Sequence, residues 1–264
     1  MRLSSMRDLR LHLRAWERHR IHFGIVCPHS RVTLCRDLFS ATCATGWNGA
    51  AGETIPGVDG AVMLETNALV YRFPYRYQDP RCRGRVNRGF LDPAPVRVLL
   101  QKLPASVSTV VMTIPHIYRT EEMTFSMFAR QLEQFLTGMP GGVNAGIELQ
   151  TSRFLLPDYF ELLARYGAIH VIGDSPSMPP PLEQIQLPLV LTAGRCIVRS
   201  AARTDPFWQL GMIEIVRRCV DEKRSLYLYL SDTEEAVEQS LIRLMELLRP
   251  DLAKLSPLRR RRAA

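Results

Sequence analysis

The sequence has little lysine and no long apolar run. Only Lys102, Lys223 and Lys254 are lysines among its 34 lysines and arginines, so nearly every cationic side chain is a guanidinium. No apolar run approaches the roughly 18 residues that a membrane-spanning helix needs, so no membrane association is expected. The basic N-terminus lacks the apolar stretch and the cleavage site of a secretory signal. These absences predict a cytoplasmic protein.

Paired cysteine and histidine motifs are missing as well. None of the 6 cysteines forms a C-x-x-C pair, and the 6 histidines include no H-x-x-x-H or H-E-x-x-H arrangement. This distribution predicts reduced, buried thiols and does not predict a histidine-rich metal site. A divalent ion held by carboxylates would leave no such trace, so metal and cofactor stay unknown.

The positive charge is confined to the two ends of the chain. Residues 1–20 carry a charge of +4 and arginines 259–262 another +4, which together make the net charge of +8 and leave 21–258 neutral. This pattern predicts a basic N-terminal arm over 1–20, a folded body over 21–250 and a basic disordered tail over 251–264. It supports nucleic-acid binding by the folded body only weakly.

Short apolar runs recur along the body at intervals that suit β/α units. They lie at 22–27, 61–65 (continuing to 71–74), 108–114, 145–149, 168–173, 195–199 and 225–230. Most of these runs do not alternate with polar residues, which favours a parallel sheet covered on both faces. The length of 264 residues suits one TIM-type (β/α) barrel. A doubly wound open parallel sheet is the alternative.

The pattern shows seven strands, one fewer than such a barrel contains. Nothing between Ile114 and Val143 resembles a strand, so either residues 40–45 supply the eighth or the barrel is irregular. The intervening helices have recognisable ends. Gly138 follows an apolar helical stripe, and Asp205 precedes Pro206 as a capping residue before a first-turn proline. Pro250 is expected to end the last helix.

The segment 144–184 is the most informative part of the chain. An apolar run ending in Glu148, a helix between Pro157 and Gly167, and a second run ending in Asp174 form one β-α-β unit. Both carboxylates stand where a parallel strand passes into its following loop. In a β/α barrel this edge carries the active site.

Several strand ends and helix starts carry a distinctive set of motifs. They are Leu64-Glu65-Thr66-Asn67-Ala68-Leu69-Val70-Tyr71-Arg72-Phe73-Pro74, Glu148-Leu149-Gln150, Leu156 to Leu163, Met178 to Gln184, Arg199, and Tyr229 to Asp232. In their order and spacing, over roughly residues 60–248, these segments resemble the YecE-like proteins, the family called domain of unknown function 72. The resemblance implies a β/α barrel, but no settled reaction comes with it.

The chain departs from the family pattern at several of its polar positions. Thr113 replaces a lysine, Gln150 an arginine, Phe154 a tryptophan, and Ser231-Asp232 a pair of asparagines. The family residues that survive are mainly Glu65, Asn67, Tyr71, Arg72, Glu148 and Arg199. This member therefore looks divergent.

Three carboxylates are candidate catalytic groups. Glu65 and Glu148 lie in apolar runs, where a carboxylate must be paired or protonated. They are either an acid/base pair or cation ligands, or else structural partners of Arg72 and Arg199. Asp174 either reacts or caps its turn. Glu65, Glu148, Asp174, Arg199 and Asp232 are all expected at the carboxyl ends of the strands.

Binding residues are expected around these carboxylates. The set comprises Asn67, Tyr71, Arg72, Arg76, Arg199, Tyr229 and Asp232. The segment from Tyr71 to Arg88 holds six arginines among aromatic residues, a combination that suits phosphate recognition. A solvated loop is the alternative interpretation.

Three functions remain open. The first is an enzyme that acts on a phosphorylated or otherwise anionic small molecule. The second is a degenerate, non-catalytic barrel that binds a ligand or a protein partner, and the third is a barrel that processes nucleic acid. Convergence of Glu65, Glu148, Arg72 and Arg199 on one open cavity would favour catalysis. A mouth filled with hydrophobic side chains would favour the degenerate barrel. The oligomeric state is not predicted.

Overall fold

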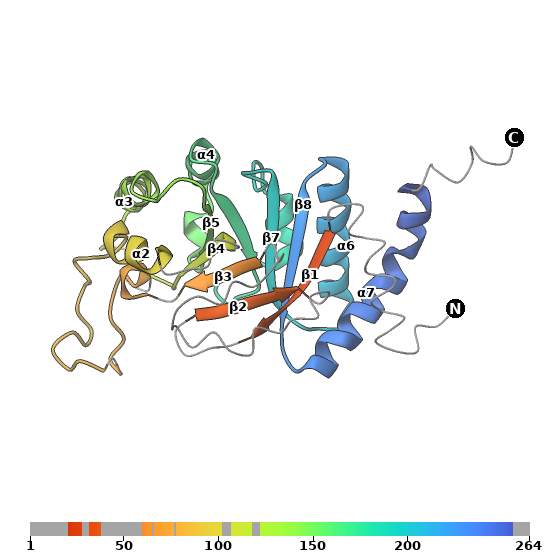
Figure 1. Ribbon diagram of the computed structural model, residues 1–264, viewed down its shortest axis with the longest axis horizontal. Coiled ribbons are helices and arrows are strands. Elements are labelled where there is room, and N and C mark those ends of the chain that lie inside the picture. The colour runs from red at the N-terminus through yellow and green to blue at the C-terminus, as the bar shows by residue number, and fades with distance from the viewer. Residues whose placement is uncertain are drawn as a thin grey trace, which may run out of the picture.

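The computed structural model describes residues 21–27, 32–37, 60–64, 66–76, 78–101, 107–117 and 122–255 (Figure 1). The strands are β1 (Ile21–Cys27), β2 (Val32–Asp37), β3 (Gly60–Leu64), β4 (Val107–Ile114), β5 (Asn144–Leu149), β6 (Ile169–Gly173), β7 (Arg195–Ala201) and β8 (Ser225–Ser231). The helices are η1 (Asn67–Leu69), α2 (Pro93–Leu100), α3 (Phe125–Thr137), η2 (Ser152–Phe154), α4 (Pro157–Arg165), α5 (Pro181–Gln186), α6 (Pro206–Asp221) and α7 (Glu234–Leu255).

Strands β4 to β8 form a curled, fully parallel sheet in sequence order. At its edges β3 pairs with β4 and β1 pairs with β8, both in parallel, while β2 pairs with β1 and β3 in antiparallel fashion and closes the ring of hydrogen-bonded neighbours. The predicted α/β class is confirmed. A complete TIM-type barrel is not, because all of its strands would be parallel. The alternative, an open parallel sheet, fits the half formed by β4–β8.

Strand β2 is the strand that the sequence did not reveal. It precedes β3 in the chain and runs against it, so the connection between them need not carry a helix. The suggested location at 40–45 lies outside the described residues. The predicted continuation of the 61–65 strand into 71–74 is wrong, because Thr66 caps η1 and turns the chain immediately after β3.

Alternate residues of the parallel strands pack into two separate cores. The side chains that face the helices join those of α3, α4, α6 and α7 in the larger core. Those on the opposite face form a smaller set, here called the inner cluster: Met63, Val111, Ile169, Val171, Ile197, Tyr227 and Tyr229. Figure 1 shows the helices flanking the strands on the outside. The strands are therefore covered on both faces, as their unalternating sequences predict.

Two of the three helix ends predicted from capping residues and prolines are confirmed. Asp205 caps α6, accepting a hydrogen bond from the Trp208 backbone nitrogen at 2.9 Å, and Pro206 is its first residue. Gly138 is the C-cap of α3. Pro250 does not end α7, which continues to Leu255. A proline removes one backbone donor from a helix, and here that loss does not stop the helix.

His170 lies on the helix-facing side of β6 and is almost completely buried. It is 2% exposed, and its ring contacts those of Tyr159 and Phe160 at centroid distances of 5.7 and 5.2 Å. Its Nδ1 lies 3.3 Å from the Tyr159 hydroxyl. Burial lowers the pKa of His170 from 6.5 to about 4, although the polar side chain of Gln184 opposes the shift. The imidazole is therefore neutral at pH 7.

This pKa predicts a loss of stability in mild acid. Below pH 6.5 the unfolded chain binds a proton at His170, while the folded chain does so only near pH 4. The free energy of unfolding should therefore fall between these values, by about 3 kcal/mol from this group. Urea titrations from pH 7 to 4 should show a shallower decline for His170→Phe, which keeps a ring in place. Equal declines for both proteins would contradict the assignment.

Candidate ligand-binding site

Glu148 and Arg199 meet on the inner face of the sheet, one level above Val111, Val171 and Ile197 of the inner cluster. Glu148 is paired in register with Thr113 of β4, and Arg199 with Gly173 of β6. The Thr113 hydroxyl donates to Glu148 Oε2 at 2.7 Å, and the Arg199 guanidinium forms an ion pair with the same oxygen. Arg199 Nη1 also lies 3.3 Å from the Thr113 hydroxyl oxygen. We call Thr113, Glu148, Gly173 and Arg199 the inner polar group.

Gly173 leaves the space that this ion pair occupies. A Cβ atom at this position would lie 2.8 Å from Glu148 Oε1 and 3.2 Å from its Cγ. The Glu148 side chain is 3% exposed, whereas that of Arg199 is 31% exposed. The carboxylate is thus enclosed and compensated, and its partner guanidinium faces the solvent side.

Adding a methyl group at Gly173 should disrupt the inner polar group. In Gly173→Ala the carboxylate of Glu148 would have to move, and moving it breaks its contacts with Thr113 and Arg199. We expect a loss of about 1–3 kcal/mol in unfolding free energy, typical of overpacking. Gly141→Ala is the matched control, since a Cβ there meets nothing within 4 Å. Equal stabilities of the two variants in urea denaturation would contradict this role.

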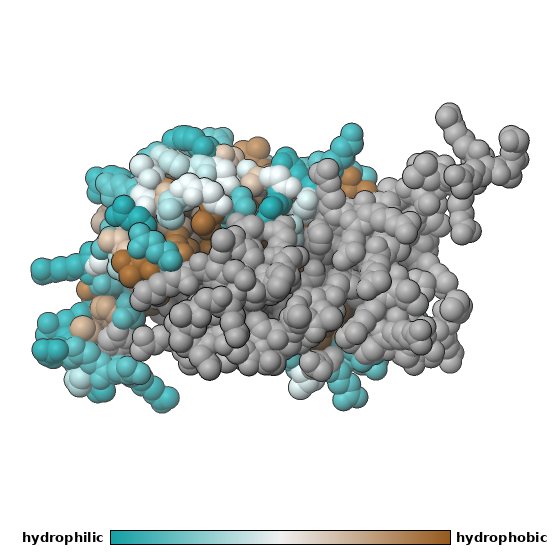
Figure 2. All heavy atoms as spheres, viewed as in Figure 1, coloured by the Kyte–Doolittle hydropathy of each residue, from teal (hydrophilic) through white to brown (hydrophobic). Residues whose placement is uncertain are grey.

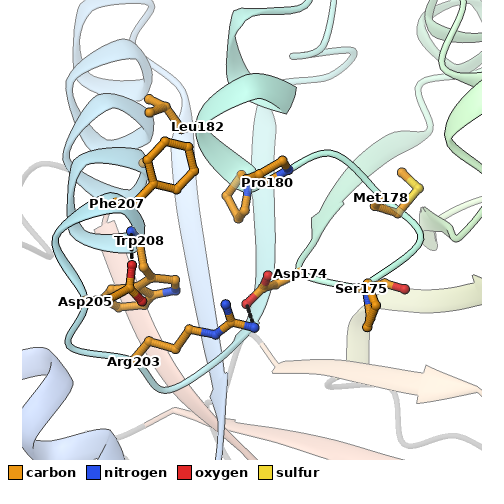
Figure 3. A pocket seen from close by; sticks show the side chains of 12 residues that line it. Asp174, Ser175, Met178, Pro180, Leu182, Arg203, Asp205, Phe207 and Trp208 are labelled. Atoms are coloured by element: carbon orange, nitrogen blue, oxygen red, sulfur yellow. Dashed lines mark hydrogen bonds and ion pairs between the residues drawn. The ribbon is translucent and has the colours of Figure 1, made fainter.

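A pocket of about 320 Å³ opens beside this group, at the carboxyl ends of β6 and β7 (Figure 3). Its lining residues are Asp174, Ser175, Pro176, Met178, Pro180, Pro181, Leu182, Arg203, Asp205, Phe207, Trp208 and Gly211. They come from the loop between β6 and α5, the loop between β7 and α6, and the facing turns of these two helices. In parallel α/β sheets, ligands bind at this edge.

A chain of hydrogen bonds holds the polar side of the pocket. The indole nitrogen of Trp208 donates to the Ser200 hydroxyl at 2.8 Å, and that hydroxyl donates to Asp174 Oδ2 at 2.9 Å. Arg203 Nη2 lies 3.1 Å from the same carboxylate oxygen. Figure 3 shows the guanidinium of Arg203 directed at Asp174. Asp174 is therefore oriented from two sides.

Backbone contacts fix the loop that carries Asp174. The Asp174 nitrogen donates to the Arg199 carbonyl at 3.1 Å, which extends the pairing of β6 and β7. The side-chain nitrogen of Gln184, a fully buried residue, donates to the carbonyls of Gly173 and Pro179 at 2.6 Å each. One side chain thus binds both ends of this loop.

Arg72, expected to grip an anion, is engaged elsewhere. Its guanidinium contacts the Gly84 carbonyl and forms an ion pair with Glu122, before α3. Tyr71 donates its hydroxyl to the Glu122 carbonyl at 3.2 Å, and burial, together with the charge of Glu122, raises the pKa of Tyr71 while Arg72 opposes the shift. The carbonyl of Asn67 accepts from the Asn87 side chain at 2.7 Å. These contacts support a structural role for the segment.

The arginines that follow are on the surface. Arg76, Arg81, Arg83, Arg85 and Arg88 are exposed. Figure 1 shows their loop extending away from β4–β8, and Figure 2 shows hydrophilic residues gathered on it. The solvated-loop interpretation fits this placement better than a loop folded over the pocket.

The remaining candidates are dispersed. Tyr229 is 4% exposed and belongs to the inner cluster. Asp232 is exposed, and its carboxylate accepts from the Thr233 backbone nitrogen at 2.7 Å, at the start of α7. Glu65 lies outside the described residues. The structure therefore brings Glu148 together with Arg199 and places Asp174 nearby, but it brings neither Arg72 nor Asp232 to them.

Ser200, Arg203 and Trp208 were not predicted. The sequence did contain a signal for a site here. β7 runs parallel to β6 and ends two residues beyond the predicted 195–199, so its carboxyl end lies next to that of β6, which Asp174 follows. Arg203, which follows the end of β7 and precedes the α6 cap Asp205, could have been proposed as a site residue for the same reason as Asp174.

Neither a metal cluster nor a membrane span is present in the part of the chain that the structure describes. No three of its histidine, cysteine, aspartate and glutamate residues are grouped so that they could hold a metal ion. Among the same residues, no helix is long and apolar enough to cross a bilayer.

Parallel strands, flanking helices and a pocket at the carboxyl edge define an α/β protein of half-barrel architecture. A family model described as "Protein of unknown function DUF72" matches residues 95–263, more than half of the chain. The chain belongs to this family, as the strand-end motifs predict. No curated protein matches it.

A solved structure of a DUF72 family protein from Thermotoga maritima is similar to this chain, at 12% sequence identity. The match covers 68% of this chain and 84% of that chain, with a TM-score of 0.32.

Proposed function

We propose that this protein binds a small molecule with an anionic group in the pocket between β6 and β7, and that its fold as a whole is an irregular TIM-type barrel. The observation that carries the proposal is the half-exposed guanidinium of Arg203, held beside a cavity by a carboxylate that is itself oriented by Ser200. Such a guanidinium can donate two parallel hydrogen bonds to a carboxylate or phosphate.

The pairing of Arg203 supports ligand binding over a purely structural role. Its side chain is 49% exposed, whereas that of Asp174 is 12% exposed. Among the described residues, the contact of Arg203 with Asp174 uses Nη2 alone, which leaves Nη1 and Nε for a ligand. An exposed ion pair of this kind contributes little to stability, about 0–1 kcal/mol.

The arrangement favours the non-catalytic alternative over the predicted carboxylate pair. Glu148 is enclosed by Thr113 and Arg199 and does not line the pocket. Arg72 lies with Glu122 rather than near these residues. Hydrophobic side chains of the inner cluster fill the space beneath Glu148. Ligand binding is therefore the function that we put first.

Catalysis by Asp174 is the second candidate. Its carboxylate lines the pocket at the end of β6, where β/α-barrel enzymes place reacting groups. It would act as a general base toward a ligand anchored on Arg203. Nucleic-acid binding stays a prediction, because residues 1–20 and 259–262 lie outside the described residues.

Binding of an anion through Arg203 can be tested with one variant and one matched control. Calorimetric titration of wild type with a panel of small carboxylates and phosphate esters should identify a ligand. Arg203→Ala should then weaken its binding about 10- to 100-fold, because charge-assisted hydrogen bonds contribute about 1.5–3 kcal/mol. Arg165→Ala removes a comparable exposed ion pair, between Arg165 of α4 and Glu133 of α3 at 3.3 Å, and should leave the affinity unchanged.

Equal affinities of wild type and Arg203→Ala would refute the proposed site. Asp174→Asn separates the two candidate functions once a turnover assay exists. Loss of turnover with retained binding would favour catalysis, and binding without any turnover in wild type would favour a non-catalytic protein.

A further inference from the structure

We infer that the ligand of this pocket is a small zwitterion with an apolar substituent, such as an α-amino acid with an aromatic or aliphatic side chain. This inference rests on the proposed function and specifies its ligand class. Three features of the pocket carry it: the adjacent opposite charges of Asp174 and Arg203, the unused oxygen of Asp174, and the apolar walls.

The charges of the pocket do not suit a simple anion. Its lining contains two carboxylates, Asp174 and Asp205, and one guanidinium, Arg203. Asp174 lies 3.1 Å from Arg203, so an anion bound to Arg203 is also close to a carboxylate of like charge. Since attraction and repulsion decay with distance in the same way, the two largely cancel. A cationic group on the same ligand turns the repulsion into attraction.

Asp174 has an oxygen available for such a cation. Its contacts with Ser200 and Arg203 both use Oδ2. Within the described residues Oδ1 has no partner, and it is not among the enclosed unpaired atoms. Figure 3 shows this second oxygen on the side of Pro180, facing across the pocket. An ammonium group there would donate to Oδ1 while the ligand's carboxylate accepts from Arg203.

Asp205 does not compete for this role. Its Oδ1 accepts the hydrogen bond that caps α6, and the positive end of the helix offsets part of its charge. Asp174 and Arg203, which lie side by side in the pocket, are thus the oppositely charged pair that a zwitterionic ligand can contact.

The rest of the pocket is apolar and small. Its apolar lining includes Met178, Pro180, Leu182, Phe207 and Trp208, with Leu182 beside the ring of Phe207 in Figure 3, and Phe207 is 49% exposed. Ligand pockets span about 300–1,000 Å³, and this one, at about 320 Å³, is at the lower end. That volume suits a single amino acid better than a nucleotide. An exposed phenylalanine beside prolines offers its ring to an apolar substituent.

A matched set of three probes tests the inference: L-phenylalanine, 3-phenylpropionate, which lacks the ammonium, and 2-phenylethylamine, which lacks the carboxylate. For wild type, L-phenylalanine should bind at least 10-fold more tightly than either of the others in calorimetric titration. Asp174→Asn should weaken L-phenylalanine at least 10-fold while 3-phenylpropionate binds as well as before or better. Arg203→Ala should weaken both. Far-ultraviolet circular dichroism and melting curves check that each variant is folded.

The outcomes separate this inference from the function on which it rests. If 3-phenylpropionate binds wild type as tightly as L-phenylalanine, with both lost in Arg203→Ala, the anion site stands and the zwitterion inference fails. The same holds if Asp174→Asn weakens both probes equally. If none of the probes binds wild type at millimolar concentration, the zwitterion inference fails. If the carboxylate and phosphate panel fails as well, the proposed function fails with it.

Discussion

The negative charge of a carboxylate enclosed inside a sheet must be balanced by a cation or by hydrogen-bond donors. In this protein that requirement fixes the register of four strands, β4 to β7. Glu148 reaches its partners only if Thr113 of β4 and Arg199 of β7 stand at its height and β6 presents no side chain between them, which Gly173 ensures. An uncompensated buried charge would cost several kcal/mol. The register of the parallel half is thereby tied to one ion pair.

The pocket inherits its geometry from this ion pair. Asp174 and Ser200 are the chain neighbours of Gly173 and Arg199, and residues next to each other in a strand point to opposite faces. Holding Gly173 level with Arg199 on the inner face therefore brings Asp174 and Ser200 together on the other, where they form their hydrogen bond. The register between β6 and β7 therefore positions both the inner polar group on one face of the sheet and the polar residues of the pocket on the other.

Much of this architecture could be predicted because its signals are local. The apolar runs of β4–β8 and the cap of α6 depend on neighbouring residues, and their positions agree with the structure to within two residues. Strand β2 could not be found in this way, since its pairing with β1 and β3 is non-local and its sequence is short. The partner of Arg72 was also unpredictable, because Glu122 is 50 residues away.

The scarcity of lysine has a structural counterpart in the described residues. Arg199 contacts both Thr113 and Glu148, and Arg72 contacts both a carbonyl and a carboxylate. A planar guanidinium can serve two acceptors at once, whereas an ammonium is a point charge on a flexible stem. Replacing such arginines with lysine is not a conservative change in this protein.

The two hydrogen bonds that the Gln184 side chain donates, to the carbonyls of Gly173 and Pro179, also bear on how the proposed ligand would enter the pocket. The wall between Gly173 and Pro181 contains four prolines and is bound at both ends by one amide. Such a segment has little conformational freedom to lose, so complex formation need not await the folding of a loop. Arg203 and Phe207, whose side chains are half exposed, are the pocket residues that a ligand bound as proposed would have to reorient. The proposed ligand would therefore enter a pocket whose wall is already formed.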